Sequence, residues 1–128
     1  MKSIFNGAGV ALVTPFYKNK IDYVSLKSLI EKTITGGASA LILLGTTGES
    51  VNISFSERKK LINFCKQQIN KRVKFIVGVG NNNMQICLKN MQLVKQCNVD
   101  GVLVVTPYYN KTTQHGLIEY YNQIAKFE

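Results

Sequence analysis

The sequence is poor in cysteine and acidic residues and lacks long apolar runs. Its three cysteines, Cys65, Cys87 and Cys97, are an odd number without C-x-x-C spacing, which argues against a disulfide framework and a zinc knuckle. We expect them to be reduced and partly buried. No apolar run reaches the roughly 18 residues of a membrane span, and the start of the chain lacks the apolar segment of a secretory signal. These absences predict a cytoplasmic protein, and no Asp, Glu, His or Cys set has metal-ligand spacing.

Basic residues outnumber acidic ones by 16 to 7, which gives a formal net charge of +9. Such a balance can indicate a nucleic-acid or anionic membrane partner. The lysines are dispersed along the chain, however, and the longest basic run is Arg58-Lys59-Lys60. This dispersal disfavours nucleic-acid binding. With 45% hydrophobic and 18% charged residues, the composition excludes an intrinsically disordered chain.

Continuous apolar runs alternate with segments of helical periodicity. The runs cover residues 9–13, 40–44, 75–79 and 101–105. Uninterrupted runs are typical of parallel strands that are covered on both faces. Each helical segment has an apolar stripe, which in the fourth consists of Leu117, Tyr121 and Ile124. The chain is therefore predicted to be an α/β protein of four βα units, (βα)₄.

Local signals place the helix ends. Asp22 is positioned to cap the first helix, Gly36 and Gly37 to end it, and Ser54 with Glu57 to form a capping box that opens the second. Four βα units can form a small doubly wound sheet or half of an eight-stranded barrel. The sequence stops within the fourth helical pattern, so we expect residues 1–128 to be a single, incomplete domain.

The expected chemistry lies after the second and fourth strands, because reactive groups collect where parallel strands end. Residues 45–50 read Gly-Thr-Thr-Gly-Glu-Ser and are called the Thr-Thr loop below. Its glycines and hydroxyls could bind a small anion or relay a proton, or could simply form a turn. Tyr108 and Tyr109 in the last loop could transfer protons or pack as aromatics. His115 has no catalytic partners nearby in sequence and is interpreted as a surface residue.

Three segments together carry a specific resemblance. They are Ala11-Leu12-Val13-Thr14-Pro15-Phe16, Gly45-Thr46-Thr47-Gly48-Glu49-Ser50 and Val105-Thr106-Pro107-Tyr108-Tyr109-Asn110. The chain closely resembles the N-terminal half of the dihydrodipicolinate synthase family, which are pyruvate-dependent class I aldolases with a TIM (β/α)₈ barrel. The superfamily also includes N-acetylneuraminate lyase, but the Thr-Thr pair is more similar to the synthases. The resemblance implies a lyase that acts without a cofactor and condenses pyruvate with aspartate 4-semialdehyde in lysine biosynthesis.

Carried over to this sequence, the resemblance implies roles for three residues. Thr46 would belong to a hydroxyl relay that moves protons at the pyruvate-derived intermediate. Thr47 would bind the pyruvate carboxylate. Tyr109 would be the relay tyrosine that reaches across a tight dimer interface, so the full-length protein is expected to form homodimers or tetramers.

The family's Schiff-base lysine lies after the sixth strand, beyond this chain. The lysines outside the helices are expected to lie away from the catalytic face, so the chain alone is predicted to be inactive. Two alternatives remain open at this point: a fragment of an N-acetylneuraminate lyase-like aldolase, and a non-enzymatic (βα)₄ module that binds an anion or pairs two half-barrels. The family's lysine-inhibited members carry a Glu where Ile86 stands, which predicts insensitivity to lysine in a full-length version.

Overall fold

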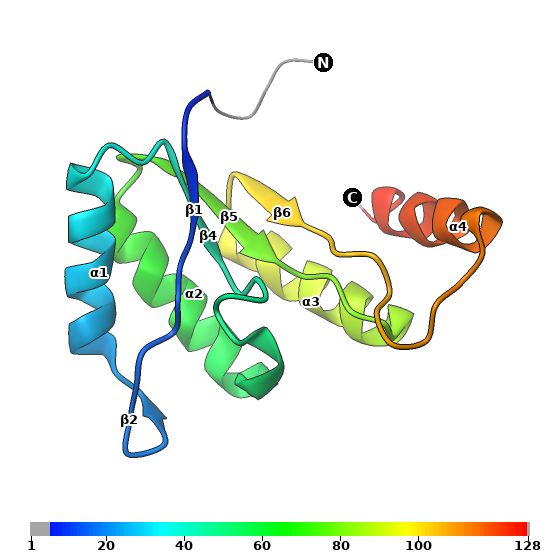
Figure 1. The fold of residues 1–128 in the computed structure, drawn as a ribbon, viewed down its shortest axis with the longest axis horizontal. Helices are drawn as coiled ribbons and strands as arrows, with labels where there is room; N and C mark the ends of the chain where they lie inside the picture. The colour runs from blue at the N-terminus through cyan, green and yellow to red at the C-terminus, as the bar shows by residue number, and fades with distance from the viewer. Residues whose placement is uncertain (1–5, 128) are drawn as a thin grey trace.

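The structure, a computed structural model, describes residues 6–127 as strands that alternate with helices (Figure 1). Residues 1–5 and Glu128, on which the expectations about a leader and about the chain's end depend, lie outside the described part. The strands are β1 (Gly9–Ala11), β2 (Phe16–Tyr17), β3 (Lys20–Ile21), β4 (Ala40–Leu43), β5 (Lys74–Gly78) and β6 (Gly101–Leu103). The helices are α1 (Tyr23–Thr35), the short 3₁₀ helix η1 (Ser50–Asn52), α2 (Phe55–Ile69), α3 (Met84–Cys97) and α4 (Gln114–Ala125).

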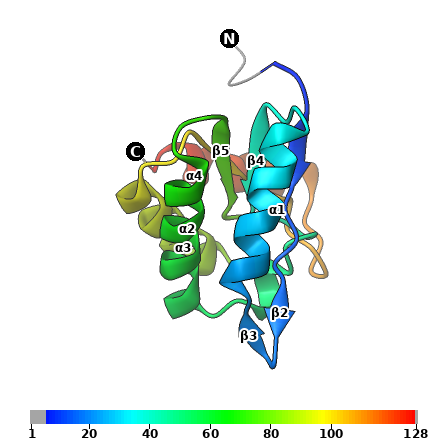
Figure 2. The same cartoon turned by 90° about the vertical axis from the view of Figure 1, so that its left-hand side faces the viewer.

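The order of the strands distinguishes a doubly wound sheet from half of an eight-stranded barrel. The main sheet is parallel and runs β1-β4-β5-β6, so each strand lies beside the next one in the chain. A doubly wound sheet would reverse its order at a switch point. Figures 1 and 2 show α1, α2 and α3 side by side along one face of this sheet, and α4 packs on α3. The expected (βα)₄ half of a barrel is confirmed, and the open doubly wound sheet is excluded.

The two faces of the sheet differ in how well they are covered. On the outer face, which packs against the helices, Leu12, Leu43 and Val77 lie in one row and are almost completely buried. On the inner face, Val13 and Leu103 keep 48% and 46% of their surface exposed. The core of the protein therefore lies between the sheet and the helices, while the inner face is open.

The expected caps are present. The Asp22 carboxylate accepts hydrogen bonds from the N–H groups of Val24 and Ser25 at 3.0 and 3.1 Å. The bond from the Ser25 hydroxyl is the main reason that the pKa of Asp22 lies below its ordinary value. Ser54 and Glu57 form the capping box, and Gly36 is the C-cap of α1, which Gly37 follows with φ +92°.

Two expectations about side chains need correction. In α4 it is Tyr120 that is buried, whereas Tyr121 is 37% exposed. Tyr120 and Ile124 lie one turn apart and pack with Cys87 of α3, so the buried stripe runs through 120 and 124. The three cysteines are free and fully buried, more completely than expected, and burial raises the pKa of Cys65 to about 12.

The hairpin of β2 and β3 was not predicted. It interrupts the connection between β1 and α1 and pairs Phe16 with Ile21. Lys18 and Asn19 form its two-residue turn with φ of 49° and 59°. Positive φ at both turn residues is the signature of the tight hairpins that match strand twist. The Asn in this short polar turn was the signal available in the sequence.

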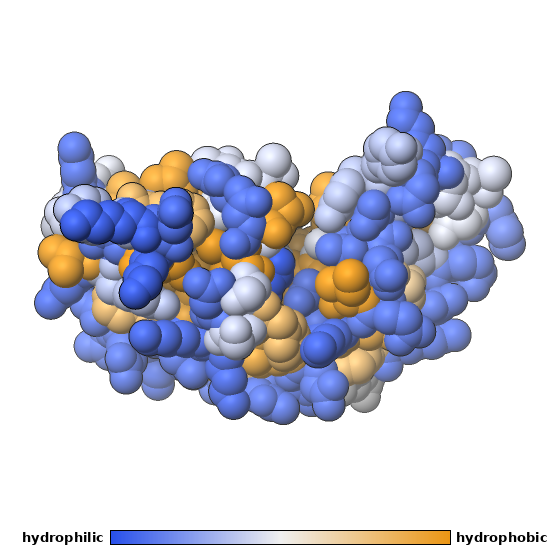
Figure 3. Space-filling model, turned by 90° about the horizontal axis from the view of Figure 1, so that it is seen from below, coloured by the Kyte–Doolittle hydropathy of each residue, from blue (hydrophilic) through white to orange (hydrophobic). Residues whose placement is uncertain are grey.

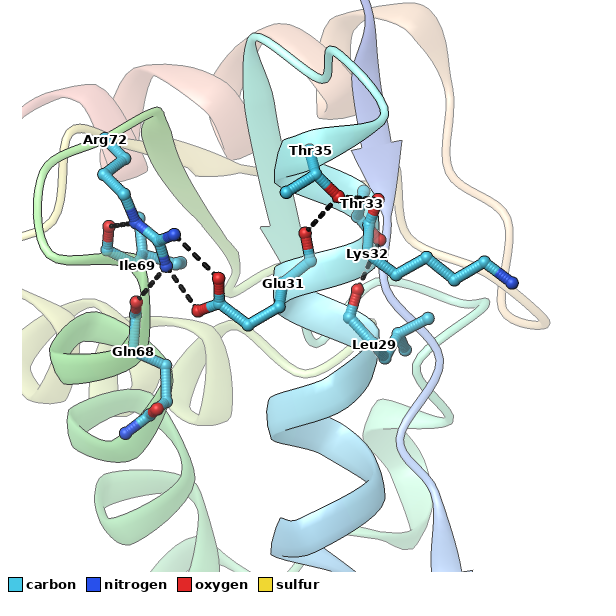
Figure 4. A network of polar contacts seen from close by, with 8 residues as sticks. All are labelled: Leu29, Glu31, Lys32, Thr33, Thr35, Gln68, Ile69 and Arg72. Atoms are coloured by element: carbon cyan, nitrogen blue, oxygen red, sulfur yellow. Dashed lines mark hydrogen bonds and ion pairs between the residues drawn. The ribbon is translucent and has the colours of Figure 1, made fainter.

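The end of the sheet at which the strands begin is held by ion pairs. Arg72, after α2, donates two hydrogen bonds to the Glu31 carboxylate of α1, at 2.8 and 2.5 Å (Figure 4). The same guanidinium donates to the carbonyls of Gln68 and Ile69. Both side chains are about 40% exposed, so the pair contributes modestly to stability. It ties α1 to α2 at the end opposite the loops discussed below.

Asp100 connects the starts of β5 and β6. Its carboxylate accepts hydrogen bonds from the Lys74 ammonium at 2.8 Å and from the Phe75 N–H at 3.0 Å. Partial burial raises the pKa of this carboxyl, but these two bonds and the nearby charges of Lys74 and Lys66 together outweigh burial and leave the pKa below its ordinary value of 3.8. The folded state thus favours the ionised carboxylate. The stability that results is present above the unfolded pKa and is lost as the pH falls through the folded pKa.

We expect Asp100→Asn to lower the free energy of unfolding by about 1 kcal/mol at neutral pH, because an uncharged amide cannot form an ion pair with the ammonium. The difference from the unsubstituted chain should shrink as the pH falls below about 4. Urea unfolding at neutral and at acidic pH measures both values. The exposed Glu119→Gln on α4 is the control, and a difference that grows in acid would contradict the assignment.

Candidate active site

The loops that follow β4, β5 and β6 surround a cavity of about 500 Å³ at the end of the sheet where the strands finish. Its walls come from the Thr-Thr loop, from Gly78 at the end of β5 with Gly80 after it, and from Leu103 at the end of β6 with Val105 and Tyr108 after it. Figure 3 looks onto this end and shows an outline hollowed on one side, with apolar side chains around the hollow. The lining is mostly apolar with a few polar groups, which is the usual character of a small-molecule site.

The Thr-Thr loop is a closed series of turns. The Gly48 N–H donates to the Gly45 carbonyl at 3.2 Å, and the Glu49 N–H donates to the Thr46 carbonyl at 3.0 Å. Both threonines are exposed, but Thr46 belongs to the lining of the cavity and Thr47 does not. The structure therefore brings Thr46 into the candidate site and places Thr47 beside it.

Thr14 stabilises the Thr-Thr loop through a buried hydrogen bond. No functional role was predicted for this residue from the sequence. It follows β1, is only 4% exposed, and its hydroxyl donates to the Gly48 carbonyl at 2.7 Å. A polar residue directly after an apolar run was the signal in the sequence. The bond fixes the second glycine of the loop and, through it, the position of Thr46.

Replacing Thr14 by Val should lower the free energy of unfolding by about 1–2 kcal/mol, because the buried Gly48 carbonyl would lose its donor. The shape of the side chain is unchanged, so packing is preserved. Thr14→Ser retains the hydroxyl and is the matched control. Urea unfolding decides the matter, and equal stabilities for the Val and Ser variants would show that the bond contributes nothing.

Arg58 of α2 stabilises the end of the Thr-Thr loop and the segment that follows it. Its guanidinium donates to the carbonyls of Ser50 and Ile53 at 2.5 and 3.2 Å. Burial holds the pKa of Arg58 below its ordinary value, and the nearby Tyr108 opposes this effect. At such a high ordinary pKa the group remains a cation at neutral pH. Arg58 thus places a positive charge between η1 and the last loop.

The two tyrosines of the last loop have different surroundings. Tyr108 lines the cavity, and its carbonyl accepts a hydrogen bond from the Asn82 side chain at 3.2 Å. Tyr109 is 96% exposed, lies outside the cavity lining, and has φ of 65°. A non-glycine residue in this region of φ is uncommon and is found where a loop must present its side chain in one direction.

Tyr120 anchors the loop after β5. Its hydroxyl donates to the Asn81 carbonyl at 2.9 Å and lies 3.7 Å from the Cys87 sulfur. Burial, followed by the contact with Cys87, raises the pKa of Tyr120 to about 12. The neutral phenol is therefore a fixed donor that joins α4 to this loop. Sequence periodicity had selected Tyr121, whose hydroxyl instead donates to the Val104 carbonyl.

The expectation that the non-helical lysines lie away from the loop end is wrong for Lys18, Lys20 and Lys111. The first two lie in the hairpin after β1, and Lys111 lies in the loop after β6. Within residues 6–127, however, no lysine lines the cavity. His115 is exposed at the start of α4, as expected.

Comparison with known proteins agrees with this architecture. The model of the dihydrodipicolinate synthetase family matches residues 4–128. The chain belongs to this family. It is 44% identical over 122 residues to 4-hydroxy-tetrahydrodipicolinate synthase 1 of Clostridium acetobutylicum, and 46% identical to the synthase of Alkaliphilus oremlandii. Each match covers 95% of this chain but only 42% of the relative, so the chain spans less than half the length of these enzymes.

Solved structures of this family have the same fold. Dihydrodipicolinate synthase from Thermotoga maritima superposes with a TM-score of 0.95 at 40% identity, over 98% of this chain and 43% of that one. The enzyme from Acinetobacter baumannii, solved in complex with pyruvate, gives a TM-score of 0.93 at 37% identity, again over 98% and 43%. Family membership therefore rests on both sequence and fold. In the described part of the chain, no helix has the length and apolar character needed to cross a membrane.

Proposed function

We propose that this chain supplies the N-terminal part of a cytoplasmic 4-hydroxy-tetrahydrodipicolinate synthase, as a single, incomplete barrel domain. The whole enzyme would condense pyruvate, bound as an enamine on a lysine, with aspartate 4-semialdehyde. The observation that carries the proposal is the position of Thr46, which lines the mostly apolar cavity at the loop end of a half-barrel of this family. The relatives described above are synthases, which favours this reaction over that of N-acetylneuraminate lyase.

In this proposal Thr46 moves a proton to and from the pyruvate-derived intermediate. A hydroxyl both donates and accepts, so it can relay a proton without placing a full charge in an apolar cavity. Thr47 would bind the pyruvate carboxylate with its hydroxyl, a role that its position beside the cavity supports. The amine that attacks the ketone would come from the part of the enzyme beyond this chain.

Tyr109 would act in the site of a neighbouring subunit. Its side chain projects from the loop after β6 with almost its whole surface exposed. Other apolar side chains are exposed on the elements around the same loop end and form, with it, the loop-end patch: Val51, Phe55, Ile86, Tyr108 and Tyr109. An exposed group of large apolar residues is typical of a protein interface. We infer that this patch forms the dimer contact in the full-length enzyme.

The test is a chimera that joins this chain to the remaining part of the Clostridium acetobutylicum synthase. We expect it to form product from pyruvate and aspartate 4-semialdehyde, and Thr46→Val to lower kcat by about 10²-fold or more, as is usual when a proton-transfer group is lost. A coupled assay of product formation measures both.

Thr35→Val is the matched control, because Thr35 is exposed on α1 and bonds only to carbonyls of its own helix. Its kcat should equal that of the unsubstituted chimera. A folded chimera without activity would overturn the proposed function and leave the non-enzymatic module as the better interpretation. Full activity in Thr46→Val would remove Thr46 from the mechanism.

A further inference from the structure

Tyr120 of α4 binds both backbone groups of one residue in the loop after β5. Its hydroxyl donates to the Asn81 carbonyl at 2.9 Å and accepts a longer bond from the Asn81 N–H at 3.4 Å. The side chain is only 7% exposed and packs with Cys87 of α3 and Ile124 of its own helix. A hydroxyl can donate and accept at once, so one buried phenol satisfies both groups. The position of Asn81 is therefore fixed by a helix outside the sheet.

The loop after β5 is also in close contact with the loop after β6. Asn90 of α3 is 3% exposed, and its side-chain amide donates to the Val79 carbonyl at 3.1 Å. Two buried side chains, from α3 and α4, thus bind the backbone on either side of Gly80. A Cβ on Gly80 would lie 2.5 Å from the Val105 nitrogen. The two loops touch backbone to backbone, so a shift of one has to move the other.

The loop after β5 in turn binds the backbone between the two tyrosines of the last loop. The Asn82 side chain donates to the Tyr108 carbonyl at 3.2 Å. This carbonyl belongs to the planar peptide unit that joins Tyr108 to Tyr109, so the bond restricts rotation of that unit. Tyr109 has φ of 65°, a conformation that a non-glycine residue keeps only where its surroundings impose it. The orientation of Tyr109 therefore depends on Asn82.

We propose that Tyr120 is a positioning residue that sets the orientation of Tyr109 through the backbone of Asn81 and the side chain of Asn82. Tyr120 does not belong to the cavity lining, so it acts through these residues. A proton-transfer group has to be placed accurately, and a displacement of about 1 Å can lower the rate by as much as 10²-fold. The catalytic part of the inference rests on the proposed function, in which Tyr109 acts in the site of a neighbouring subunit.

The first test is steady-state kinetics of the chimera described above in its Tyr120→Phe form, which lacks only the hydroxyl. We expect kcat to fall about tenfold while the KM for pyruvate stays within about twofold, because the Thr-Thr loop is not touched. Tyr23→Phe is the matched control, since this ring lies on α1 and packs on Phe64 of α2, and its kcat should be unchanged. Circular dichroism shows that each variant is folded. An unchanged kcat in Tyr120→Phe, or a loss confined to KM, would overturn the proposal.

A double-mutant cycle separates positioning of Tyr109 from a general loss of structure. In the Tyr109→Phe chimera the relay hydroxyl is absent, so adding Tyr120→Phe should lower kcat no further, because residues that act as a unit are not additive. An equal loss in both backgrounds would show that Tyr120 acts independently of Tyr109, which contradicts the proposal. Asn82→Ala breaks the second link and should lower kcat with the same unchanged KM. An unchanged kcat in this variant would also contradict the proposal.

Hydrogen exchange tests the link between the loops without relying on activity. In the folded chimera, Tyr120→Phe should speed the exchange of amides in residues 79–83 and 106–110 and leave residues 45–50 unchanged. Faster exchange confined to residues 79–83 would overturn the proposal. If the unsubstituted chimera is folded but inactive, the proposed function fails, and exchange in residues 106–110 still decides whether Tyr120 orders the loop that carries Tyr109.

Discussion

Treatment of the 128-residue chain with pyruvate and borohydride is expected to leave its mass unchanged. A reducible adduct requires an amine within reach of the pyruvate ketone. In residues 6–127 the cavity at the loop end has no lysine in its lining, even though Lys18, Lys20 and Lys111 lie on loops at that end. The family resemblance places the reactive lysine in the part of the barrel that the chain does not contain. Intact-mass spectrometry measures the result directly.

The chimera with the Clostridium acetobutylicum synthase should gain one reduced adduct under the same conditions, because it restores that part of the barrel. It should also gain the adduct in the Thr46→Val form, more slowly, since the hydroxyl moves protons and does not supply the amine. A stoichiometric adduct on one lysine of the 128-residue chain would contradict the assignment of the missing group.

Gly78→Ala is expected to lower the free energy of unfolding by about 3 kcal/mol or more, at the upper end of the cost of forcing atoms into a packed site. Leu44 follows β4 with φ of 58°, which turns its carbonyl over Gly78 of β5. A Cβ on Gly78 would lie 2.2 Å from that carbonyl oxygen and 2.7 Å from its carbon. Both are backbone atoms, so relief requires β4 and β5 to separate. Urea unfolding monitored by circular dichroism measures the loss.

Gly45→Ala is the matched control, only one residue after Leu44. A Cβ there would meet only the end of the Leu103 side chain, at 3.9 Å, which is an ordinary contact. We expect its stability to stay within about 0.5 kcal/mol of the unsubstituted chain, as for most substitutions without a specific clash. Equal stabilities for the two alanine variants would show that the close approach of β4 and β5 is not a constraint on the fold.

Much of the fold could be predicted because its signals are local. Asp22 and the pair Ser54 and Glu57 identify helix starts by the hydrogen bonds that free N–H groups require, whatever the helix packs against. Continuous apolar runs identify the strands of the main sheet, although only the outer face of that sheet is covered in the structure. The motifs of the loops after β4 and β6 identify the family, which the comparisons confirm.

The candidate site could be predicted only in part. The Thr-Thr loop was identified from its residues, but the separation of Thr46 in the cavity from Thr47 beside it depends on the turn that the loop makes. Tyr108 lines the cavity, whereas the neighbouring Tyr109 projects into solvent with φ of 65°. The sequence did not predict this difference between two adjacent tyrosines. Thr14 has its role only because Gly48, far along the chain, comes within 2.7 Å of its hydroxyl.

The sequence by itself determined where the helices and main strands form and which family the chain resembles, because propensity, capping and periodicity act between residues close in the chain. Only the tertiary structure decided that the inner face of the sheet is left open and that Tyr120 is buried in place of Tyr121. These outcomes depend on which surfaces meet when the chain closes on itself. The open inner face is the clearest case, since Val13 and Leu103 are as apolar as Leu43 and Val77, and only the position of the helices determines which of them are buried.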